Sequence, residues 1–452
     1  MKKLSFIQIL SISVMLFAMF FGAGNMIFPA SMGQLAGTNY FSALMGFILT
    51  DAGIAILGIA AVVFAGTSMN DLASLIGKKF AIFFGILIYL LIGPLFALPR
   101  TGSVSFEIMI SPYLDGNVFV PSIIFTMIFF GITYYLSSNP SKIVDIISNY
   151  LTPVLLLSIF IIFIASLIKE PVSGTLDFGT MVSPSGKYIE IPFFTGMVEG
   201  YNALDGPAGL AFAIIVINAI KNCGIKEKRN IIQYTLLCGI FAAVFLSVVY
   251  FMLTYVGALT ATPFENGGAL LHAVTNYLFG NLGAVVLGVA VLLACLTTSI
   301  GLTTAFADYF DTMFPKYSYK KIAACVCIFS FIVANVGLST LISISLPILI
   351  MIYPVTVVLI ILSFMKKYIK HRRMIYILSM SLTFIVSFFN GLDNAGIQIN
   401  FINNLYHMLP FYEYNLGWVS PAIIGAIFGY IPYWPSNKGK VLNAIEKEKE
   451  VK

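Results

Sequence analysis

The sequence predicts an all-α integral membrane protein with about twelve transmembrane helices, and its composition and its apolar stretches carry that prediction. Of the 452 residues, 59% are hydrophobic and only 10% are charged, with a mean hydropathy of +0.96. A soluble protein of this size needs roughly a quarter of its residues charged to cover its surface. Twelve apolar stretches approach or exceed the roughly twenty helical residues that a bilayer core requires.

The positions of the lysine and arginine residues support this assignment. The candidate spans cover residues 6–33, 40–66, 80–110, 119–136, 143–168, 191–220, 231–258, 281–310, 322–337, 340–364, 374–391 and 416–434. With the N-terminus placed inside, only Lys169 and Lys187 of the 25 basic residues fall in outside loops, and only Arg100 falls within a span. One missed helix would scramble this alternation. We therefore expect a multi-pass protein of the cell membrane with both termini in the cytoplasm.

The first span is interrupted near its middle. Residues 21–25 read Phe-Gly-Ala-Gly-Asn, and Pro29 follows. Two glycines and an asparagine weaken helical propensity, and backbone groups freed by a break need new partners in lipid. Close packing of two helices through small residues would also explain the glycines, but such packing does not require the asparagine.

The sixth span carries a second interruption. Residues 199–209 include three glycines, a proline, an asparagine and two carboxylates at membrane depth. Asp205 stands directly before Gly206-Pro207, which is typical of the start of a helix. We therefore predict two half-helices in this span, joined by an unwound segment.

Spans one and six occupy the same place in two consecutive groups of five helices. Because five is odd, the second group has the opposite orientation in the membrane. We expect a single membrane domain over residues 1–452, with inverted repeats at 5–168 and 191–364, two additional helices at 374–434 and a cytoplasmic tail at 435–452. Paired broken helices in an inverted repeat indicate the binding site of a secondary transporter. Half-helix N-termini can hold an anionic group, and exposed carbonyls can hold an ammonium or a sodium ion.

Polar side chains inside other spans are further candidates for function. Span eight contains the hydroxyl run Thr297-Thr298-Ser299, which either bonds back to the preceding turn or supplies oxygen ligands for a small hard cation. Five ionisable residues lie within the spans: Asp51, Arg100, Glu107, Glu199 and Asp205. Intramembrane charges are candidates for function by default, although a structural pair of Arg100 with Glu107 and a plain helix cap at Asp205 are open alternatives. Asp51 has no assigned role.

Four segments resemble a known family. Residues 20–29, 92–101 (followed by Ser105-Phe106-Glu107), 199–209 and 294–302 look like signatures of the branched-chain amino acid transport system II carriers, the leucine/isoleucine/valine:cation symporters. The resemblance extends from about residue 5 to residue 434. It implies a cation-coupled importer of leucine, isoleucine and valine with the five-plus-five inverted-repeat fold of sodium-coupled leucine transporters.

The resemblance also implies roles for individual residues. Together with the breaks in the spans, it leads to a predicted set of substrate-binding residues: Gly22, Ala23, Gly24, Asn25, Phe96, Tyr201, Asn202 and Asp205. The N–H groups of Ala23 and Gly24 would bind the substrate carboxylate, and carbonyls around Tyr201 and Asn202 would bind its ammonium. For the substrate side chain, the candidates are Leu95, Phe96 and Phe212.

The implied ion-binding residues are Ala18, Phe21, Asn25, Thr297, Thr298 and Ser299. Thr297 and Thr298, or Thr298 and Ser299 if the register differs by one, would join the carbonyls of Ala18 and Phe21 in one sodium site. Asn25 would belong to another. The residues that could carry proton or charge coupling are Arg100, Glu107, Glu199 and Asp205. Whether sodium or protons drive transport is open.

Other classes of function fit less well. A membrane-embedded enzyme is disfavoured because the chain has no HExxH motif, and His272, His371 and His407 fall in predicted loops. A channel would need a pore-lining ring, usually from a symmetric oligomer, rather than two broken helices in one chain. The nearest rival is a permease of the same fold for another neutral amino acid or a nucleobase. We expect no cofactor other than a coupling ion, and no nucleic-acid partner.

Introduced cysteines test the predicted orientation. Lys187→Cys, in the predicted outside loop 169–190, should react with an impermeant thiol reagent added to intact cells. Lys228→Cys, in the predicted cytoplasmic loop 221–230, should stay unlabelled until the cells are opened. Both variants are made in a chain whose five native cysteines are replaced. Equal labelling of the two positions in intact cells would contradict the topology.

Overall fold

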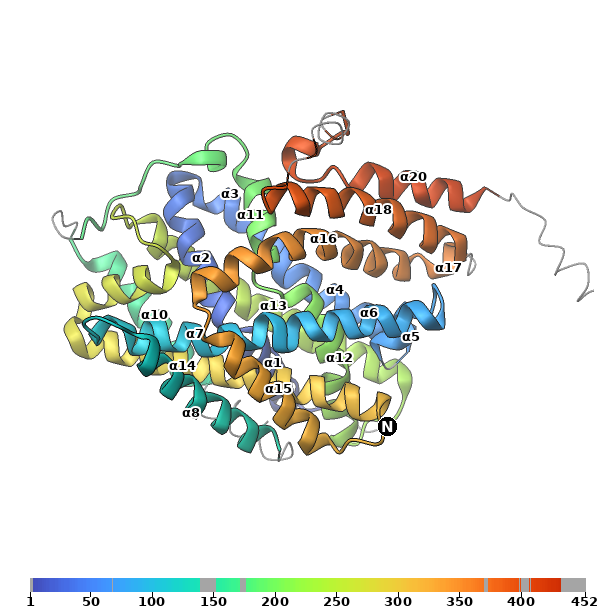
Figure 1. Cartoon of the computed structure of the whole chain (residues 1–452), viewed down its shortest axis with the longest axis horizontal. Coiled ribbons are helices and arrows are strands. Elements are labelled where there is room, and N and C mark those ends of the chain that lie inside the picture. The colour runs from blue at the N-terminus through green and yellow to red at the C-terminus, as the bar shows by residue number, and fades with distance from the viewer. Residues whose placement is uncertain are drawn as a thin grey trace, which may run out of the picture.

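The computed structural model describes residues 3–66, 68–138, 152–170, 176–369, 373–397, 399, 406 and 408–431. The described residues form helices and connecting loops, with one isolated β-bridge between Phe178 and Thr260. Figure 1 shows the long helices running side by side as one bundle. The predicted all-α class is confirmed.

The helices of the first five predicted spans are α1 (Phe6–Phe20) and α2 (Ala23–Ala36), α3 (Tyr40–Ile48), the π-helix η2 (Leu49–Gly53) and α4 (Ile54–Ala65), α6 (Lys78–Leu90), the π-helix η3 (Leu91–Leu95) and α7 (Ala97–Met109), α8 (Phe119–Ser137), and α10 (Thr152–Ile168). The start of the fifth predicted span, residues 143–151, lies outside the described residues.

The helices of the remaining spans are α11 (Pro192–Tyr201) and α12 (Asp205–Asn222), α13 (Lys228–Ala258), α14 (Gly267–Met313), α15 (Tyr319–Ala334), α16 (Leu338–Phe364), α18 (Arg373–Asn394) and α20 (Val419–Tyr430). The short helices of the connections are η1 (Gly37–Asn39), α5 (Met69–Ala73), η4 (Ser111–Tyr113), η7 (Gly186–Tyr188), α17 (Lys366–Ile369) and η8 (Tyr412–Tyr414). The predicted tail at 435–452 lies outside the described residues.

By length and apolar composition alone, seven of the described helical segments can cross a membrane, and the bent pair α11–α12 makes an eighth. Three shorter apolar helices, α1, α10 and α20, lie among them. The multi-pass character is therefore clear, and the count of twelve stays a prediction.

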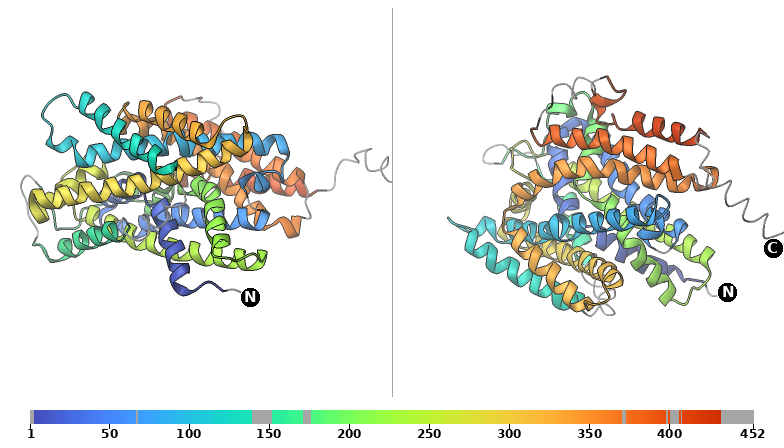
Figure 2. Two further views of the ribbon diagram at one scale, coloured as in Figure 1. Left: turned by 90° about the horizontal axis from the view of Figure 1, so that it is seen from below. Right: turned by 45° about the vertical axis from the view of Figure 1, so that its right-hand side comes forward.

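The helices of the two predicted halves pack in a reciprocal pattern. Half-helix α2 of span one packs on α13 of span seven, and half-helix α12 of span six packs on α4 of span two. In the same way, α1 packs on α13 while α11 packs on α3, and α7 packs directly on α14. This exchange of partners is expected of two equivalent five-helix halves. Helices α18 and α20 lie together along one flank, against α16 (Figures 1 and 2). The exact boundaries of the halves stay predictions.

Loops that the charge pattern assigns to one side of the membrane meet in the structure. Phe178 bridges to Thr260, and the ammonium of Lys169 lies 5.3 Å from the centre of the Tyr277 ring, which joins two predicted outside loops. At the other end of the bundle, Arg373 donates to the carbonyl of Ile76, which joins two predicted cytoplasmic loops. Which of these faces is cytoplasmic stays a prediction.

Two features of the helices differ from the sequence-based expectation. The sequence analysis named breaks only in spans one and six, but the third span is also broken, at Gly93, which has non-helical backbone angles (φ −87°, ψ −119°) within η3. Pro94 lacks an N–H donor, and its ring clashes with the preceding turn, so the helix kinks there. His272 was expected in a loop but lies in the first part of α14, before the kink at Gly280. His371 and His407 lie outside the described residues.

Close contact between α3 and α11 depends on glycine, which makes Gly196→Ala informative. A Cβ atom at Gly196 would lie 2.0 Å from the carbonyl oxygen of Ala43, so the two backbones would have to separate. We expect the variant to be destabilised by about 1–3 kcal/mol, the usual cost of overpacking. Thermal unfolding of the purified protein in detergent measures this. The matched control is Gly131→Ala on α8, where nothing lies within 4 Å of the new Cβ; equal destabilisation of both variants would contradict the close contact.

Candidate functional site

The break in span one lies where the sequence predicts it. Helix α1 ends at Phe20, α2 begins at Ala23, and Gly22 between them is extended (φ −119°, ψ −155°). The side-chain oxygen of Asn25 accepts the N–H of Gly22 at 3.1 Å, which gives this backbone donor a partner away from water. A Cβ at Gly22 would lie 2.8 Å from the hydroxyl oxygen of Thr298, so only glycine fits against α14 at this point.

The break in span six is also confirmed. Helix α11 ends at Tyr201, α12 begins at Asp205, and the two half-helices are bent by 49°. Leu204 between them has a left-handed backbone (φ +71°), which is unusual for a residue other than glycine. Asp205 starts the helix as predicted, but it is not a plain cap, because its carboxylate bonds to residues of other helices.

A buried polar network joins the two breaks to spans two and seven. The side-chain amide of Asn25 donates to Asp205 at 2.7 Å and to the hydroxyl of Tyr250 at 2.6 Å. Tyr250 in turn donates to Asp51 at 2.5 Å and lies 3.5 Å from Asp205. All four side chains are at most 3% exposed. Two carboxyl groups therefore share one tyrosine hydroxyl in a buried site.

Asp51 lies within the π-helix η2 of span two. Single turns of π-helix often mark functional sites, since they displace a side chain and change the backbone hydrogen bonds. The carbonyl of Thr50 accepts a hydrogen bond from the hydroxyl of Tyr353 on α16, and the Tyr353 ring stacks on Tyr201 with ring centres 4.2 Å apart. The π-helix is thus held from both span six and span ten.

Arg100 is buried beside the break in span six, with 2% of its surface exposed. One guanidinium nitrogen donates to the carbonyl of Asn202 at 2.6 Å, and another donates to the hydroxyl of Ser345 at 2.8 Å. The guanidinium carbon lies 5.3 Å from the centre of the Phe28 ring, within the range of a cation–π contact. The third nitrogen, Nε, is buried without a hydrogen-bond partner among the described residues.

Arg100 does not pair with Glu107, so that alternative is wrong. Glu107 is half-buried and accepts a hydrogen bond from the side chain of Asn266 at 2.5 Å. The two residues share a face of α7, but Arg100 turns toward spans six and ten while Glu107 turns toward the start of α14. Glu199 likewise bonds locally, accepting from the Asn202 side chain at 3.0 Å.

In the hydroxyl run of span eight, Thr297 and Thr298 face the end of α1, and Ser299 does not. Thr297 contacts the carbonyl oxygens of Ala18 and Ala294 at 3.1 and 2.7 Å, and Thr298 contacts that of Ala18 at 3.4 Å. Thr297 therefore bonds back to its own helix and also reaches the end of α1. Ser299 points elsewhere, toward Thr133 of α8 at 3.0 Å, so it does not join the other two hydroxyls. Phe21, the C-cap of α1, is buried in the same break.

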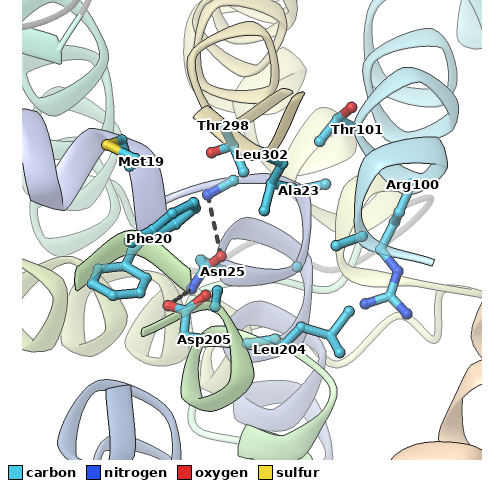
Figure 3. A pocket seen from close by; sticks show the side chains of 16 residues that line it. Met19, Phe20, Ala23, Asn25, Arg100, Thr101, Leu204, Asp205, Thr298 and Leu302 are labelled. Carbon is cyan, nitrogen blue, oxygen red and sulfur yellow. Dashed lines mark hydrogen bonds between the residues drawn. The ribbon is translucent and has the colours of Figure 1, made fainter. Parts of the chain in front are cut away.

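A small cavity lies between the two breaks (Figure 3). It is lined by Met19, Phe20, Gly22, Ala23, Gly24, Asn25, Ala97, Arg100, Thr101, Ala203, Leu204, Asp205, Ala208, Phe212, Thr298 and Leu302. Five of the eight predicted substrate-binding residues belong to this set, together with Phe212. The cavity reaches both the polar network, through Asn25 and Asp205, and the hydroxyl run, through Thr298.

Three predicted substrate-binding residues do not line the cavity. Phe96 packs in the apolar core, as a neighbour of the kink in span three. Tyr201 stacks on Tyr353, and the carbonyl of Asn202 is occupied by Arg100. Leu95, the other side-chain candidate from span three, is also absent from the cavity wall. Ala97 and Thr101 of α7, beyond the kink at Gly93, line the cavity where Leu95 and Phe96 were expected.

Sequence reasoning missed Tyr250, Tyr353 and the place of Asp51 in the network. A signal was present in each case. Asp51 is a charge in the middle of an apolar span, and each tyrosine lies inside a long apolar helix, where its hydroxyl needs a partner. The sequence did not indicate which groups would meet.

The fold and the site define a multi-pass helical transporter built around broken helices. A solved structure of Mhp1, described as a nucleobase-cation-symport-1 family transporter in a closed conformation with bromovinylhydantoin bound, matches with a TM-score of 0.61. The match covers 93% of this chain and 91% of that one. At 14% sequence identity, this likeness shows the fold alone.

The sequence comparisons show the particular family. Residues 5–435 match the family described as branched-chain amino acid transport protein. The chain is 44% identical to the branched-chain amino acid permease BrnQ of Bacillus subtilis (strain 168), over 95% of this chain and 98% of the relative. It is 41% identical to BraB of the same organism (96% and 97% covered) and 38% identical to BrnQ of Lactobacillus delbrueckii subsp. lactis (94% and 96% covered). This chain belongs to the branched-chain amino acid transport protein family.

Removing one hydroxyl tests the polar network. Tyr250→Phe deletes the group that Asp51, Asp205 and Asn25 share, and it leaves buried polar atoms without a partner. We expect a loss of about 1–3 kcal/mol in the free energy of unfolding, the usual cost of an unsatisfied buried group. Chemical or thermal unfolding in detergent measures the effect. Tyr255→Phe on the same helix is the control, because that hydroxyl takes no part in the network; a stable Tyr250→Phe variant would show that the network contributes little.

Proposed function

We propose that this protein imports leucine, isoleucine and valine across the cell membrane together with sodium ions, by alternating access around the broken spans one and six. The observation that carries the proposal is the cavity between the two breaks, next to the hydroxyls of Thr297 and Thr298. Family membership and the names of the relatives support the substrate class. In this proposal both termini lie in the cytoplasm.

The cavity wall supports a branched aliphatic substrate. Its apolar side is built from Met19, Phe20, Phe212 and Leu302, which offer no hydrogen bonds to a polar side chain. Burial of each methylene contributes about 0.8 kcal/mol. Leucine should therefore bind more tightly than alanine by at most about two orders of magnitude.

The oxygen atoms around Thr297 support sodium as the coupling ion. Sodium is a hard cation that prefers oxygen ligands. The hydroxyl of Thr297 contacts the carbonyl oxygens of Ala18 and Ala294, and the hydroxyl of Thr298 contacts that of Ala18. The carbonyl of Phe21 in the adjacent break is a fifth candidate. Such a site has no fixed charge, so the ion can be released in every transport cycle. Asn25 and Ser299 are not part of this group in our proposal.

Proton coupling is the second candidate, and one observation favours it. Asp51 and Asp205 contact the same hydroxyl of Tyr250, and two buried carboxylates this close do not both ionise readily. One proton held between them would suit a proton-coupled permease of the same fold. Such a permease could carry another neutral amino acid or a nucleobase.

Uptake into proteoliposomes tests the function. A sodium gradient at equal pH should drive saturable leucine uptake, which isoleucine and valine compete with and lysine and uracil do not. Alanine should compete only at about 100-fold higher concentration, for the reason given above. Competition by lysine or uracil as strong as that by leucine would sink the proposed substrate class.

Variants of the hydroxyl run then separate the two coupling ions. Thr297→Ala and Thr298→Ala should each raise the sodium concentration for half-maximal uptake by about tenfold, which corresponds to the loss of one ligand at about 1.4 kcal/mol. Thr303→Ala on the same helix, whose hydroxyl lies 3.9 Å from the sulfur of Cys327, is the matched control. Uptake driven by a pH gradient without sodium, abolished by Asp51→Asn and unchanged in both threonine variants, would assign the coupling to the carboxyl pair.

A further inference from the structure

The cavity between the breaks carries one positive and one negative group. Arg100 and Asp205 are the ionisable side chains among its lining residues, and they come from spans three and six. Figure 3 shows Arg100 on one side of the cavity and Asp205 on another, with Leu204 between them in this view. Both are almost fully buried, with 2% and 3% of their surfaces exposed.

Neither charge has an ion-pair partner within the described part of the chain. Arg100 bonds to a carbonyl and a hydroxyl, and its Nε has no partner. Asp205 bonds to the amide of Asn25 and the hydroxyl of Tyr250, and the carboxyl group on the other side of that hydroxyl belongs to Asp51, another acid. A buried charge without an opposite partner is strongly unfavourable, so both groups are suited to an ion pair with a bound molecule.

Arg100 and Asp205 are both attached to the unwound linker of span six. Arg100 donates to the carbonyl of Asn202, three residues before Asp205, so the unwound linker of span six links the positive side of the cavity to the negative side. Asn25 fixes Asp205 from the start of α2, and Ser345 fixes Arg100 from α16. The positions of both charges therefore depend on the same break that forms the cavity.

We propose that Asp205 binds the ammonium of the substrate and that Arg100 binds its carboxylate, so that a zwitterionic amino acid completes two ion pairs in this cavity. The proposal rests on the proposed function, because it concerns the same cavity. It moves the ammonium away from the carbonyl of Asn202, where Arg100 already donates and a second cation would be repelled. It also explains why the cavity holds an acid and a base that leave each other unpaired.

Single-charge analogues of leucine test this without any variant. 3-Methylbutylamine keeps the ammonium and the branched side chain, and 4-methylpentanoate keeps the carboxylate and the side chain. Binding to the purified full-length protein, measured by isothermal titration or by competition with radiolabelled leucine, should be at least tenfold weaker for each analogue than for leucine. If 3-methylbutylamine binds as tightly as leucine, the role of Arg100 is overturned. If 4-methylpentanoate does so, the role of Asp205 is overturned.

Two variants then assign each charge to its partner. Asp205→Asn should weaken leucine binding by about 10- to 100-fold and leave 4-methylpentanoate binding within about threefold, since that analogue has no ammonium. Arg100→Gln should weaken leucine binding by the same range and leave 3-methylbutylamine binding within about threefold. The assignment is overturned if Asp205→Asn weakens the binding of 4-methylpentanoate as much as that of leucine. It is equally overturned if Arg100→Gln weakens the binding of 3-methylbutylamine as much as that of leucine. Glu170→Gln, which removes an exposed carboxylate, is the control for net charge.

Folding and function are checked separately. Arg100→Lys keeps the positive charge, so it should still bind leucine more tightly than 3-methylbutylamine, which lacks the carboxylate. This variant replaces Arg100→Gln if the latter does not yield monodisperse protein. A wild-type protein that binds none of leucine, isoleucine or valine overturns the proposed substrate class. Leucine binding that is normal in wild type and unchanged in both charge variants overturns the charge assignment alone.

Discussion

The need to satisfy polar groups away from water shapes this protein more than any other constraint. A break in a membrane helix frees backbone donors and acceptors that lipid cannot replace. In span one, Asn25 resolves this by accepting the N–H of Gly22 through its oxygen and donating to Asp205 and Tyr250 through its nitrogen. One amide side chain thus closes the first break, fixes the start of the second half-helix of span six, and connects both to span seven.

Close packing of the half-helices follows from the same constraint. Helices in lipid gain no hydrophobic free energy from association, so they depend on contact between backbones and on polar bonds. The glycines provide that contact in reciprocal pairs. A Cβ at Gly33 of α2 would meet the carbonyl of Thr254 on α13, and one at Gly209 of α12 would meet the carbonyl of Ala55 on α4. Each half-helix therefore lies directly on the neighbouring span of the other half.

The arrangement links the cavity to the hydroxyls of span eight. Thr298 lines the cavity, contacts the carbonyl of Ala18, and packs against Gly22 so closely that no side chain fits there. A movement of α1 relative to α14 would change the cavity wall and the spacing of the oxygens around Thr297 together. Such a shared element is what coupling between an ion and a substrate requires physically, because each ligand must favour the same conformation.

Local composition was sufficient to locate the breaks at residues 21–25 and near Asp205, because glycine, proline and asparagine weaken a helix wherever it packs. The sequence also indicated the hydroxyl run and the intramembrane charges. It could not indicate that Asp51 meets Asp205, that Arg100 turns to Asn202 rather than Glu107, or that Ser299 faces α8. Those contacts depend on how each helix is rotated about its axis, which changes at the π-helix of span two and the kink at Gly93. Rotation is decided by packing against neighbours that are distant in the chain, so only the tertiary structure decides which buried polar groups become partners.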